Sequence, residues 1–282
     1  MLFRSLNATP IATKSNLKWD ISFNWAANRS KIVATTGGID NFFIGNDRDV
    51  TVAASPDRPF GDFRGRRFKR NAAGQVLVGA DGLPFRNEFD EVIGNYLPKW
   101  TGGMINTVSY KNFRFSFLID TRQGGEIFSL TNVLASNNGN AKATLVGRDA
   151  WYAGTGGYLV NGVVDNGSGV FSQNTKFVNP QDYWAKVAAP GLAIAEPFIY
   201  DASFIKFREL TLGYTLPKKW LAKSFIKAAS FSLVGRNLFL IQSNTPGFDP
   251  DVASYGIGNV QSIENAAFPS TRSYGFNLNI SL

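Results

Sequence analysis

The stretch SYGFNLNISL, residues 273–282, alternates between two kinds of side chain from its first residue to its last. Tyr274, Phe276, Leu278 and Ile280 are apolar, and the residues between them are glycine or asparagine. Because successive side chains of a β-strand point to opposite faces, this period of two predicts a strand with one apolar face and one uncharged polar face. The fold class depends on how often this pattern recurs.

The same alternation is found upstream in LKWDISFNW (residues 17–25), FRFSFLID (113–120) and LTLGYTL (210–216). SFSLVGRNLFLIQ (230–242) begins in the same way and then loses its phase, and a second phase shift falls around Arg208. Such shifts predict β-bulges or bends within strands. The chain is therefore predicted to be all-β.

Composition narrows the classes of function. The chain has 282 residues, with 29 Lys and Arg against 21 Asp and Glu, and it contains neither Cys nor His. Thiol nucleophiles, Ser-His-Asp triads and the usual zinc sites are thereby excluded. We expect no catalytic residue, no metal and no cofactor, although a pair of carboxylates would still be able to support hydrolysis.

The positive net charge does not indicate a nucleic-acid partner. The densest basic run is RGRRFKR (residues 64–70), and the other Lys and Arg residues are dispersed along the chain. Dispersed charge is typical of a solvated surface, so we predict no binding to nucleic acid. Residues 1–14 lack the pattern of a signal peptide.

Seven strands are predicted, at about residues 2–9 (ending before Pro10), 16–28 (with room to extend to Thr36), 100–110, 113–128, 202–216, 228–242 and 271–282. Their connections alternate in length. The short turns are 10–15, 110–113 and 217–227, and the long loops are 37–98, 129–200 and 243–270. Inside the first long loop, GADGLPF (79–85) predicts a hairpin turn, with about 60–70 pairing with 75–79.

Two architectures produce strands with one apolar face. A soluble sandwich packs these faces together, whereas a membrane barrel turns them toward lipid. The uncharged polar face of the last strand and the alternation of short and long connections favour the barrel. Aromatic residues near strand ends also favour it: Trp19, Trp25, Trp100, Tyr110, Tyr214 and Trp220. A soluble all-β carbohydrate-binding module is the alternative, and a carboxylate-pair enzyme is a third reading without an identified pair.

Several motifs together resemble one protein family. They are SFIKFRELTLGYTLP (203–217), GRNLF (235–239), GFDPD (247–251) and AFPSTRSYGFNLNISL (267–282), and upstream residues 6–32, 58–68 and 94–129. The chain resembles the C-terminal barrel portion of SusC/RagA-type TonB-dependent outer-membrane transporters of Bacteroidetes. Leu282 departs from the Phe or Trp with which many outer-membrane barrels end.

The resemblance implies a large transmembrane β-barrel of about twenty-two strands, with residues 1–282 as its C-terminal segment. It implies TonB-dependent import of a nutrient such as a glycan or a peptide, in the bacterial outer membrane. The implied partners are a SusD-like lipoprotein lid, outer-membrane lipid, and the TonB complex acting through an N-terminal part. The plug domain, the TonB box and the signal peptide are expected to lie outside this segment.

Three groups of residues receive expected roles. Loop aromatics that can stack on a ligand or contact the lid are Trp151, Tyr152, Tyr183 and Trp184. Polar residues expected to face the lumen or plug are Arg236, Asn237, Asn277 and Asn279. Residues expected to face lipid are Tyr274, Phe276, Leu278 and Ile280. PKKWLAK (217–223) is interpreted as a periplasmic turn, with Trp220 at the membrane interface and its lysines near headgroups.

Overall fold

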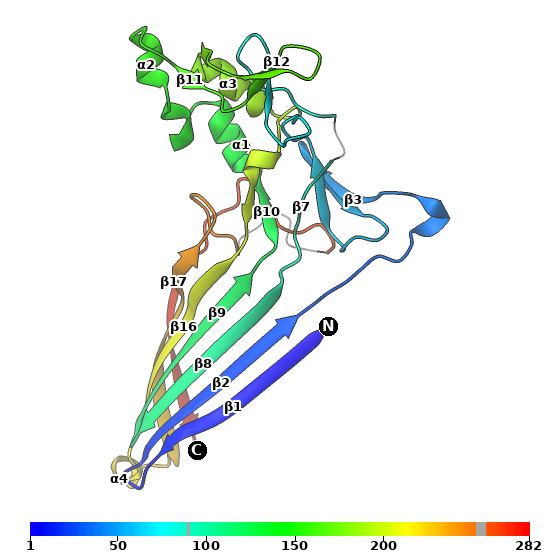
Figure 1. Ribbon diagram of the computed structural model, residues 1–282. Coiled ribbons are helices and arrows are strands. Elements are labelled where there is room, and N and C mark those ends of the chain that lie inside the picture. Colours follow the sequence, from blue (N-terminus) through cyan, green and yellow to red (C-terminus); the bar gives the residue numbers. More distant parts are fainter. Residues whose placement is uncertain (89–90, 252–257) are drawn as a thin grey trace.

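The computed structural model describes residues 1–88, 91–251 and 258–282. Its largest element is a seven-stranded sheet in the order β1-β2-β8-β9-β16-β17-β19 (Figure 1). Every neighbouring pair is antiparallel. The strands are β1 (Leu2–Ala12), β2 (Leu17–Ala27), β8 (Trp100–Tyr110), β9 (Phe113–Gln123), β16 (Phe204–Thr215), β17 (Ala228–Ser243) and β19 (Ser273–Ser281). The expectation of an all-β chain with seven antiparallel strands is confirmed.

Two of the expected strand boundaries were wrong. β1 does not end before Pro10 but continues through it, because the pairing with β2 shifts register between Ala8 and Ile11. A bulge tolerates proline, which has no N–H to donate to a neighbouring strand. β9 ends at Gln123 rather than near residue 128, because Gly124 and Gly125 both take positive φ angles, of 74° and 76°. They turn the chain out of the sheet.

The predicted phase shifts are bulges. β16 changes register between Phe207 and Glu209 against both of its neighbours. Against β9, Arg208 is the extra residue, whereas against β17 the extra residue lies on β17, where Asn237 and Leu238 face Arg208. In β17, Asn237 has a φ of 51° at the facing position. A bulge re-aims side chains relative to the regular alternation, and Arg208 and Asn237 both make contacts described below.

The alternation divides the sheet into an apolar and a polar face. Across the strands, Leu278 pairs with Phe231, Phe231 with Tyr214, and Tyr214 with Phe113. The rings of Phe113 and Tyr214 are 4.7 Å apart, and those of Tyr214 and Phe231 are 5.9 Å apart. Phe113, Phe231 and Leu278 are about half exposed and Tyr214 is partly exposed, and among the described residues no second sheet covers them. The sandwich alternative, which requires such a cover, does not fit this arrangement.

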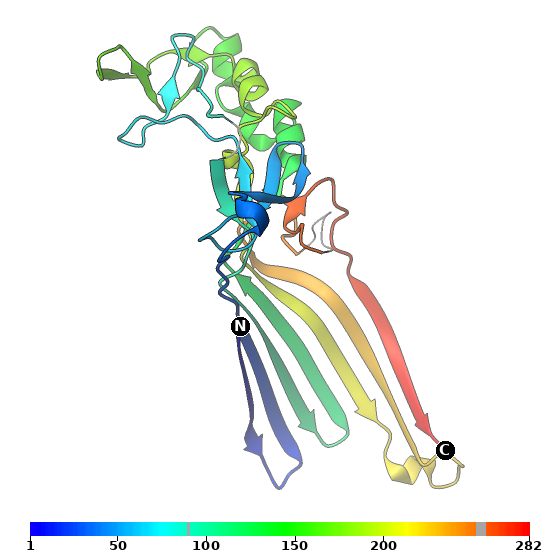
Figure 2. The ribbon, with the colours of Figure 1, turned by 90° about the vertical axis from the view of Figure 1, so that its right-hand side faces the viewer.

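All short turns lie at one end of the sheet and all long connections at the other (Figures 1 and 2). The turns lie side by side: the amide of Lys111 donates to the carbonyl of Asn16, and the amide of Thr215 donates to the carbonyl of Asn112. The third turn contains α4 (Lys218–Leu221). The last strand, β19, ends beside this turn, where the amide of Lys227 donates to the carbonyl of Ser281 over 2.8 Å.

The first long connection has its own structure. Strands β3 (Phe42–Asp47), β4 (Val50–Ala54), β5 (Asp62–Gly65) and β7 (Glu91–Asn95) form an antiparallel sheet, preceded by a 3-10 turn at Thr36–Gly38. The predicted turn in GADGLPF is present, because the amide of Gly79 donates to the carbonyl of Leu83 and the amide of Phe85 to that of Leu77. The pairing expected between about 60–70 and 75–79 is shorter in the structure, where an isolated bridge joins Arg70 and Val76.

The second connection contains helices that the sequence analysis missed. They are α1 (Leu130–Asn137), α2 (Arg148–Tyr152) and α3 (Pro180–Val187), with 3-10 turns at Lys142–Leu145 and Glu196–Phe198. Asn179 caps α3 by accepting from the amide of Gln181, and Pro180 occupies its first turn. Short strands complete this part: β11 (Tyr158–Leu159), β12 (Val163–Asp165), β13 (Phe171–Gln173) and β14 (Phe177–Val178). β12 also pairs with β6 (Leu77–Val78) of the first connection.

The third connection is tied to the second. β18 (Ile263–Glu264) pairs with β10 (Glu126–Ser129), which also pairs with β15 (Ile199–Asp201). The buried carboxylate of Glu264 accepts hydrogen bonds from the hydroxyls of Ser129, at 2.5 Å, and Thr131, at 2.6 Å. Residues 252–257 of the predicted third loop lie outside the described residues.

The hydrophobic core lies in the connections rather than in the main sheet. Its fully buried members are Val50, Val52, Phe63, Phe128, Val133, Val187, Ala188, Ala193, Ile194, Ala195 and Ile263. We call this compact region at the loop end the loop lobe, residues 36–88, 91–98, 126–201 and 258–264. Among the described residues no helix is long and apolar enough to cross a membrane.

The two faces of β19 give a first test. In the full-length protein, Leu278→Arg should impair assembly much more than Asn279→Arg if the apolar face meets lipid as expected, because a cation on a lipid-facing position costs ~2–4 kcal/mol at the middle of the bilayer. Assembly is measured as the folded, heat-modifiable fraction in isolated outer membranes. Equal tolerance of the two substitutions would contradict the outward assignment of Leu278.

Candidate functional site

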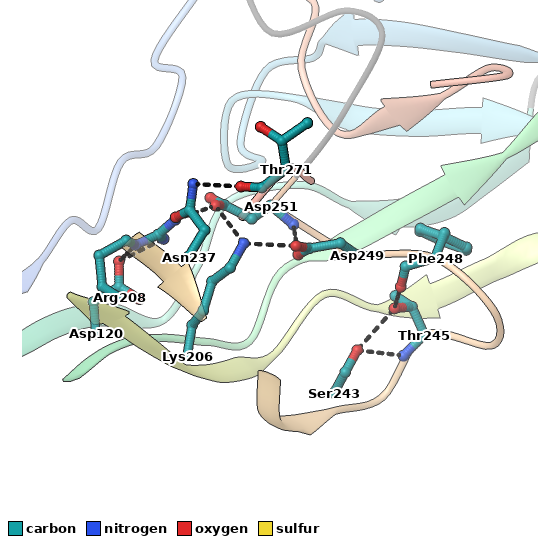
Figure 3. Close-up of polar contacts among 10 residues, drawn as sticks. All are labelled: Asp120, Lys206, Arg208, Asn237, Ser243, Thr245, Phe248, Asp249, Asp251 and Thr271. Atoms are coloured by element: carbon teal, nitrogen blue, oxygen red, sulfur yellow. Dashed lines mark hydrogen bonds and ion pairs between the residues drawn. The ribbon is translucent and has the colours of Figure 1, made fainter. Parts of the chain in front are cut away.

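The sequence motifs that carry the family resemblance meet in space at the loop end of the sheet (Figure 3). Lys206 of β16 is buried, and its side chain is only 2% exposed. Its Nζ lies 2.6 Å from a carboxylate oxygen of Asp249 and 3.2 Å from one of Asp251. A buried ammonium is tolerated only when it is paired and hydrogen-bonded. Lys206 therefore ties the GFDPD segment to the sheet.

Arg208, the bulge residue of β16, extends the same cluster. Its guanidinium donates to Asp120 Oδ2 over 2.9 and 2.6 Å, to Asp251 Oδ2 over 2.7 Å, and to Asn237 Oδ1 over 3.0 Å. We call Asp120, Lys206, Arg208, Asp249 and Asp251 the ion cluster. Each of its carboxylates is bonded to a cation, so the cluster does not offer a free carboxylate pair for hydrolysis.

Local turn chemistry shapes the segment that reaches this cluster. Gly247 has a φ of 81°, a conformation that favours glycine. The hydroxyl of Thr245 donates to the carbonyl of Phe248 over 2.7 Å, and the Phe248 ring packs edge-on against Tyr200 at 6.0 Å. The amide of Asp251 donates to Asp249 Oδ1 over 3.0 Å, which holds both carboxylates toward Lys206.

Arg236 and Asn237 contact neighbouring segments. Arg236 Nε donates to Glu209 Oε2 over 2.8 Å, and its side chain is 62% exposed. Asn237 accepts from Arg208 and donates to the carbonyl of Thr271 over 3.4 Å. Asn277 and Asn279 pair with Ser232 and Ser230 of β17, on the face opposite Leu278. That this polar face borders a lumen stays a prediction.

A pocket of about 490 Å³ opens beside the ion cluster. Its charged lining consists of Asp120, Arg122, Arg208 and Asp251, and Gln261 and Ser262 come from the third connection. Two buried atoms at this pocket, Asp120 Oδ1 and Arg122 Nε, have no hydrogen-bond partner. Because a buried polar atom without a partner is costly, we take this pocket as a candidate docking point for a polar group.

A second pocket, of about 370 Å³, lies in the loop lobe. It is lined by amide side chains, by the guanidinium of Arg148, and by the rings of Tyr152 and Trp184. The amides are those of Asn137, Asn138, Asn140, Asn179 and Gln181. Amides, a guanidinium and aromatic rings without a carboxylate suit a ligand that has many hydrogen-bond acceptors. Among the described residues no three of Asp and Glu gather to hold a metal ion.

The four aromatic candidates of the sequence analysis do not form one site. Tyr152 and Trp184 share the second pocket, whereas Trp151 does not line it. Tyr183 is buried and stacks on Tyr158 with ring centres 4.0 Å apart. Burial, followed by the hydrogen bond with Tyr158, raises the pKa of Tyr183 well above its usual value. Tyr183 therefore packs within the lobe and is not accessible to a ligand.

The sequence analysis predicted neither the ion cluster nor the second pocket. One signal for the cluster was present: two cations two residues apart in FIKFREL and two carboxylates two residues apart in GFDPD. Their pairing joins segments about forty residues apart, at separations of 43 and 45. Charge spacing alone does not select such a partner.

The architecture is a single open antiparallel sheet whose large folded connections all lie at one end. We compared this chain with known proteins. No model of a protein family matches the chain. It is 25% identical over 306 residues to TonB-dependent receptor P3 of Formosa agariphila, covering 98% of the chain and 28% of that relative. It is 27% identical over 270 residues to TonB-dependent receptor SusC of Bacteroides thetaiotaomicron, covering 89% of the chain and 24% of that relative.

Solved structures have the same fold. The RagAB peptide transporter superposes with a TM-score of 0.64 at 17% identity, over 98% of this chain and 28% of that chain. The RagAB peptide importer in its open-open state gives a TM-score of 0.64 at 16% identity, over 99% and 28%. At such identities the likeness establishes the fold alone.

The resemblance to TonB-dependent receptors of the SusC/RagA type is confirmed by these comparisons. The chain spans about a quarter of the length of the curated relatives that it matches, 28% for P3 and 24% for SusC.

The ion cluster predicts a large effect of one substitution. Lys206→Met in the full-length receptor leaves Asp249 buried without its cation, so we expect a loss of stability of about 3–5 kcal/mol. The measurement is the temperature at which the folded band disappears in seminative electrophoresis. Lys69→Met, at an exposed lysine of the loop lobe, is the control and should change little. The double variant Lys206→Met/Asp249→Asn should recover part of the loss, and an unchanged melting temperature for Lys206→Met would contradict this assignment.

The same cluster predicts a dependence on pH. Burial alone would raise the pKa of Asp251, but the hydrogen bond and charge of Arg208, together with Lys206, outweigh it and lower this pKa. A lowered folded pKa means that the stabilisation is present above the unfolded value of about 3.9 and is lost as pH falls through the folded pKa. Hydrogen exchange of residues 244–251 should therefore increase in acid below about pH 4. Asp251→Asn should flatten this dependence, and the same pH curve in both proteins would exclude Asp251 as its source.

Proposed function

We propose that the chain is the C-terminal barrel segment of a SusC-like, TonB-dependent importer of the bacterial outer membrane. One observation carries this proposal: a single-layer sheet presents a continuous apolar face that no described segment covers. Side chains on it such as Phe115, Leu233 and Phe276 are 40%, 57% and 76% exposed. In water such a face would favour aggregation, whereas lipid provides its natural cover.

Strand length supports the same location. β2, β8 and β9 each have 11 residues. At ~3.3 Å per residue and a tilt of ~40°, such a strand rises roughly 25–28 Å, which is the height of the apolar band of an outer-membrane barrel. The edge strands β1 and β19 each pair with one strand among the described residues. Inside a bilayer, the free N–H and C=O groups at a sheet edge need hydrogen-bond partners from protein, because lipid offers none. Further strands of a longer barrel would supply these partners.

The polar face and the loop lobe are then the parts available to a substrate. The pocket beside the ion cluster has balanced charges and suits a ligand with both cationic and anionic groups, such as a peptide. The amide-lined pocket with Tyr152 and Trp184 suits the hydroxyls of a glycan or the amides of a peptide. The RagAB peptide importer, which has the same fold, supports the peptide class, and the family resemblance of the sequence supports the glycan class. We propose a small glycan or peptide as the ligand.

The proposed partners follow from the same relatives. A SusD-like lipoprotein would cover the loop lobe, and the TonB complex would act through an N-terminal part of the receptor. The ion cluster would hold the GFDPD segment fixed at the mouth of the barrel while these parts move. Catalysis is not part of this proposal.

Topology is the most direct test. We expect the loop lobe outside the cell and the short turns in the periplasm, so single cysteines at Asn138 and Asn166 of the full-length receptor should react with an impermeant maleimide on intact cells. A cysteine at Lys218 should react only after the outer membrane is opened. All three positions are exposed, so a difference in labelling reports on the side of the membrane.

The chain contributes no cysteine of its own, and the parent receptor, with any cysteine outside this chain replaced by serine, serves as the blank. Labelling at Lys218 with protection of Asn138 and Asn166 would invert the proposed orientation. Recovery of the receptor in the soluble fraction would contradict the membrane location itself.

A further inference from the structure

The positive charge that is dispersed in the sequence is gathered by the fold at one end. The short-turn end comprises residues 12–20, 108–116 and 213–230, which contain eight cations and one carboxylate, Asp20. The cations are Lys14, Lys18, Lys111, Arg114, Lys218, Lys219, Lys223 and Lys227. We call these eight residues the basic rim. Since the whole chain has 29 cations and 21 carboxylates, the remaining residues hold 21 against 20 and are nearly neutral.

The basic rim is one continuous surface. Backbone hydrogen bonds join the three turns, from Lys111 to Asn16 and from Thr215 to Asn112, and Figure 2 shows the turns at the same end of the sheet. All eight cations are exposed. One ion pair is present within the rim, between Lys18 and Asp20 at 2.8 Å. A carboxyl group at Leu282 would offset a single further charge.

Exposed aromatic side chains lie among these cations. Trp220 and Phe225, both in the turn that follows β16, are 62% and 79% exposed. Tyr110 and Phe113 flank the β8–β9 turn, and the ammonium of Lys111 lies 5.2 Å from the Tyr110 ring centre. Aromatic rings next to lysines are typical of the boundary between hydrocarbon and headgroups, where the ring enters the apolar layer and the ammonium reaches the phosphate.

We propose that the six turn lysines of the basic rim bind the headgroups of anionic phospholipids in the leaflet next to the short turns, while Lys18 and Arg114 lie on the polar face of the sheet. The proposal rests on the barrel location proposed above and adds a lipid class and a site to it. Charge complementarity argues for lipid: the rim extends across three turns, and the apolar face of the sheet ends at it. Each lysine close to an anionic membrane surface adds roughly a fivefold gain in binding.

The test compares two sets of three lysines in the full-length receptor. The rim variant is Lys218→Gln/Lys219→Gln/Lys223→Gln. The matched control is Lys69→Gln/Lys142→Gln/Lys186→Gln, at exposed lysines of the loop lobe. Each receptor, purified in a neutral detergent, is mixed with equal amounts of phosphatidylglycerol and phosphatidylcholine, and native mass spectrometry counts the bound lipids. We expect the unmodified and control receptors to retain phosphatidylglycerol preferentially. In the rim variant, the ratio of bound phosphatidylglycerol to bound phosphatidylcholine should be at least about tenfold lower.

A second measurement does not depend on the folding of any variant. In the unmodified receptor the preference for phosphatidylglycerol should fall as salt is raised from about 0.05 to 0.5 M, because exposed charges are screened. Equal retention of the two lipids would overturn the proposal and favour an acidic protein as the partner. Equal losses in the rim and control variants, or a preference insensitive to salt, would overturn it as well. Membrane insertion without lipid preference would contradict this inference alone, whereas absence from the membrane would contradict the proposed function too.

Discussion

The side-chain period of two, kept in register across antiparallel neighbours, is the constraint on which the rest of the structure depends. It places Phe113, Tyr214, Phe231 and Leu278 in one row and their polar neighbours on the other face. A slip of one residue would exchange the two faces of a strand. The bulge at Arg208 absorbs such a slip locally, and it is this bulge that presents a guanidinium to the ion cluster.

The strands could be predicted from the sequence because their signal is local: alternation is visible in nine residues, and β8 was placed to the residue. The residues at which the strands depart from the expected boundaries are also visible in the sequence, but their effect depends on the surrounding structure. Pro10 is accepted because it lies in a bulge, where β1 shifts register against β2, and Gly124 ends β9 through its positive φ. Neither neighbour relations nor backbone angles can be derived from alternation alone.

The candidate site was less accessible to sequence reasoning, since it is made of long-range pairings. Lys206 and Asp249 are separated by 43 positions in the sequence. The basic rim combines three turns that are spread over more than two hundred residues of the chain. The helices of the loop lobe did have a local signal, Asn179 before Pro180, but it was hidden in a stretch expected to be a loop. The chain thus combines a sheet without a buried core and connections that contain one.

That combination has a consequence for the order in which the chain folds. Each pair of strands joined by a short turn is a local hairpin and can form early, whereas β2 and β8 meet only after about seventy residues have been spanned. For a flexible connection this closure would cost only ~0.6 kcal/mol more for each doubling of its length. The core of the loop lobe draws residues from all three connections, so each connection is held closed by its packing against the others. Growth of a surface loop outside this core would therefore add little to the cost of bringing β2 to β8.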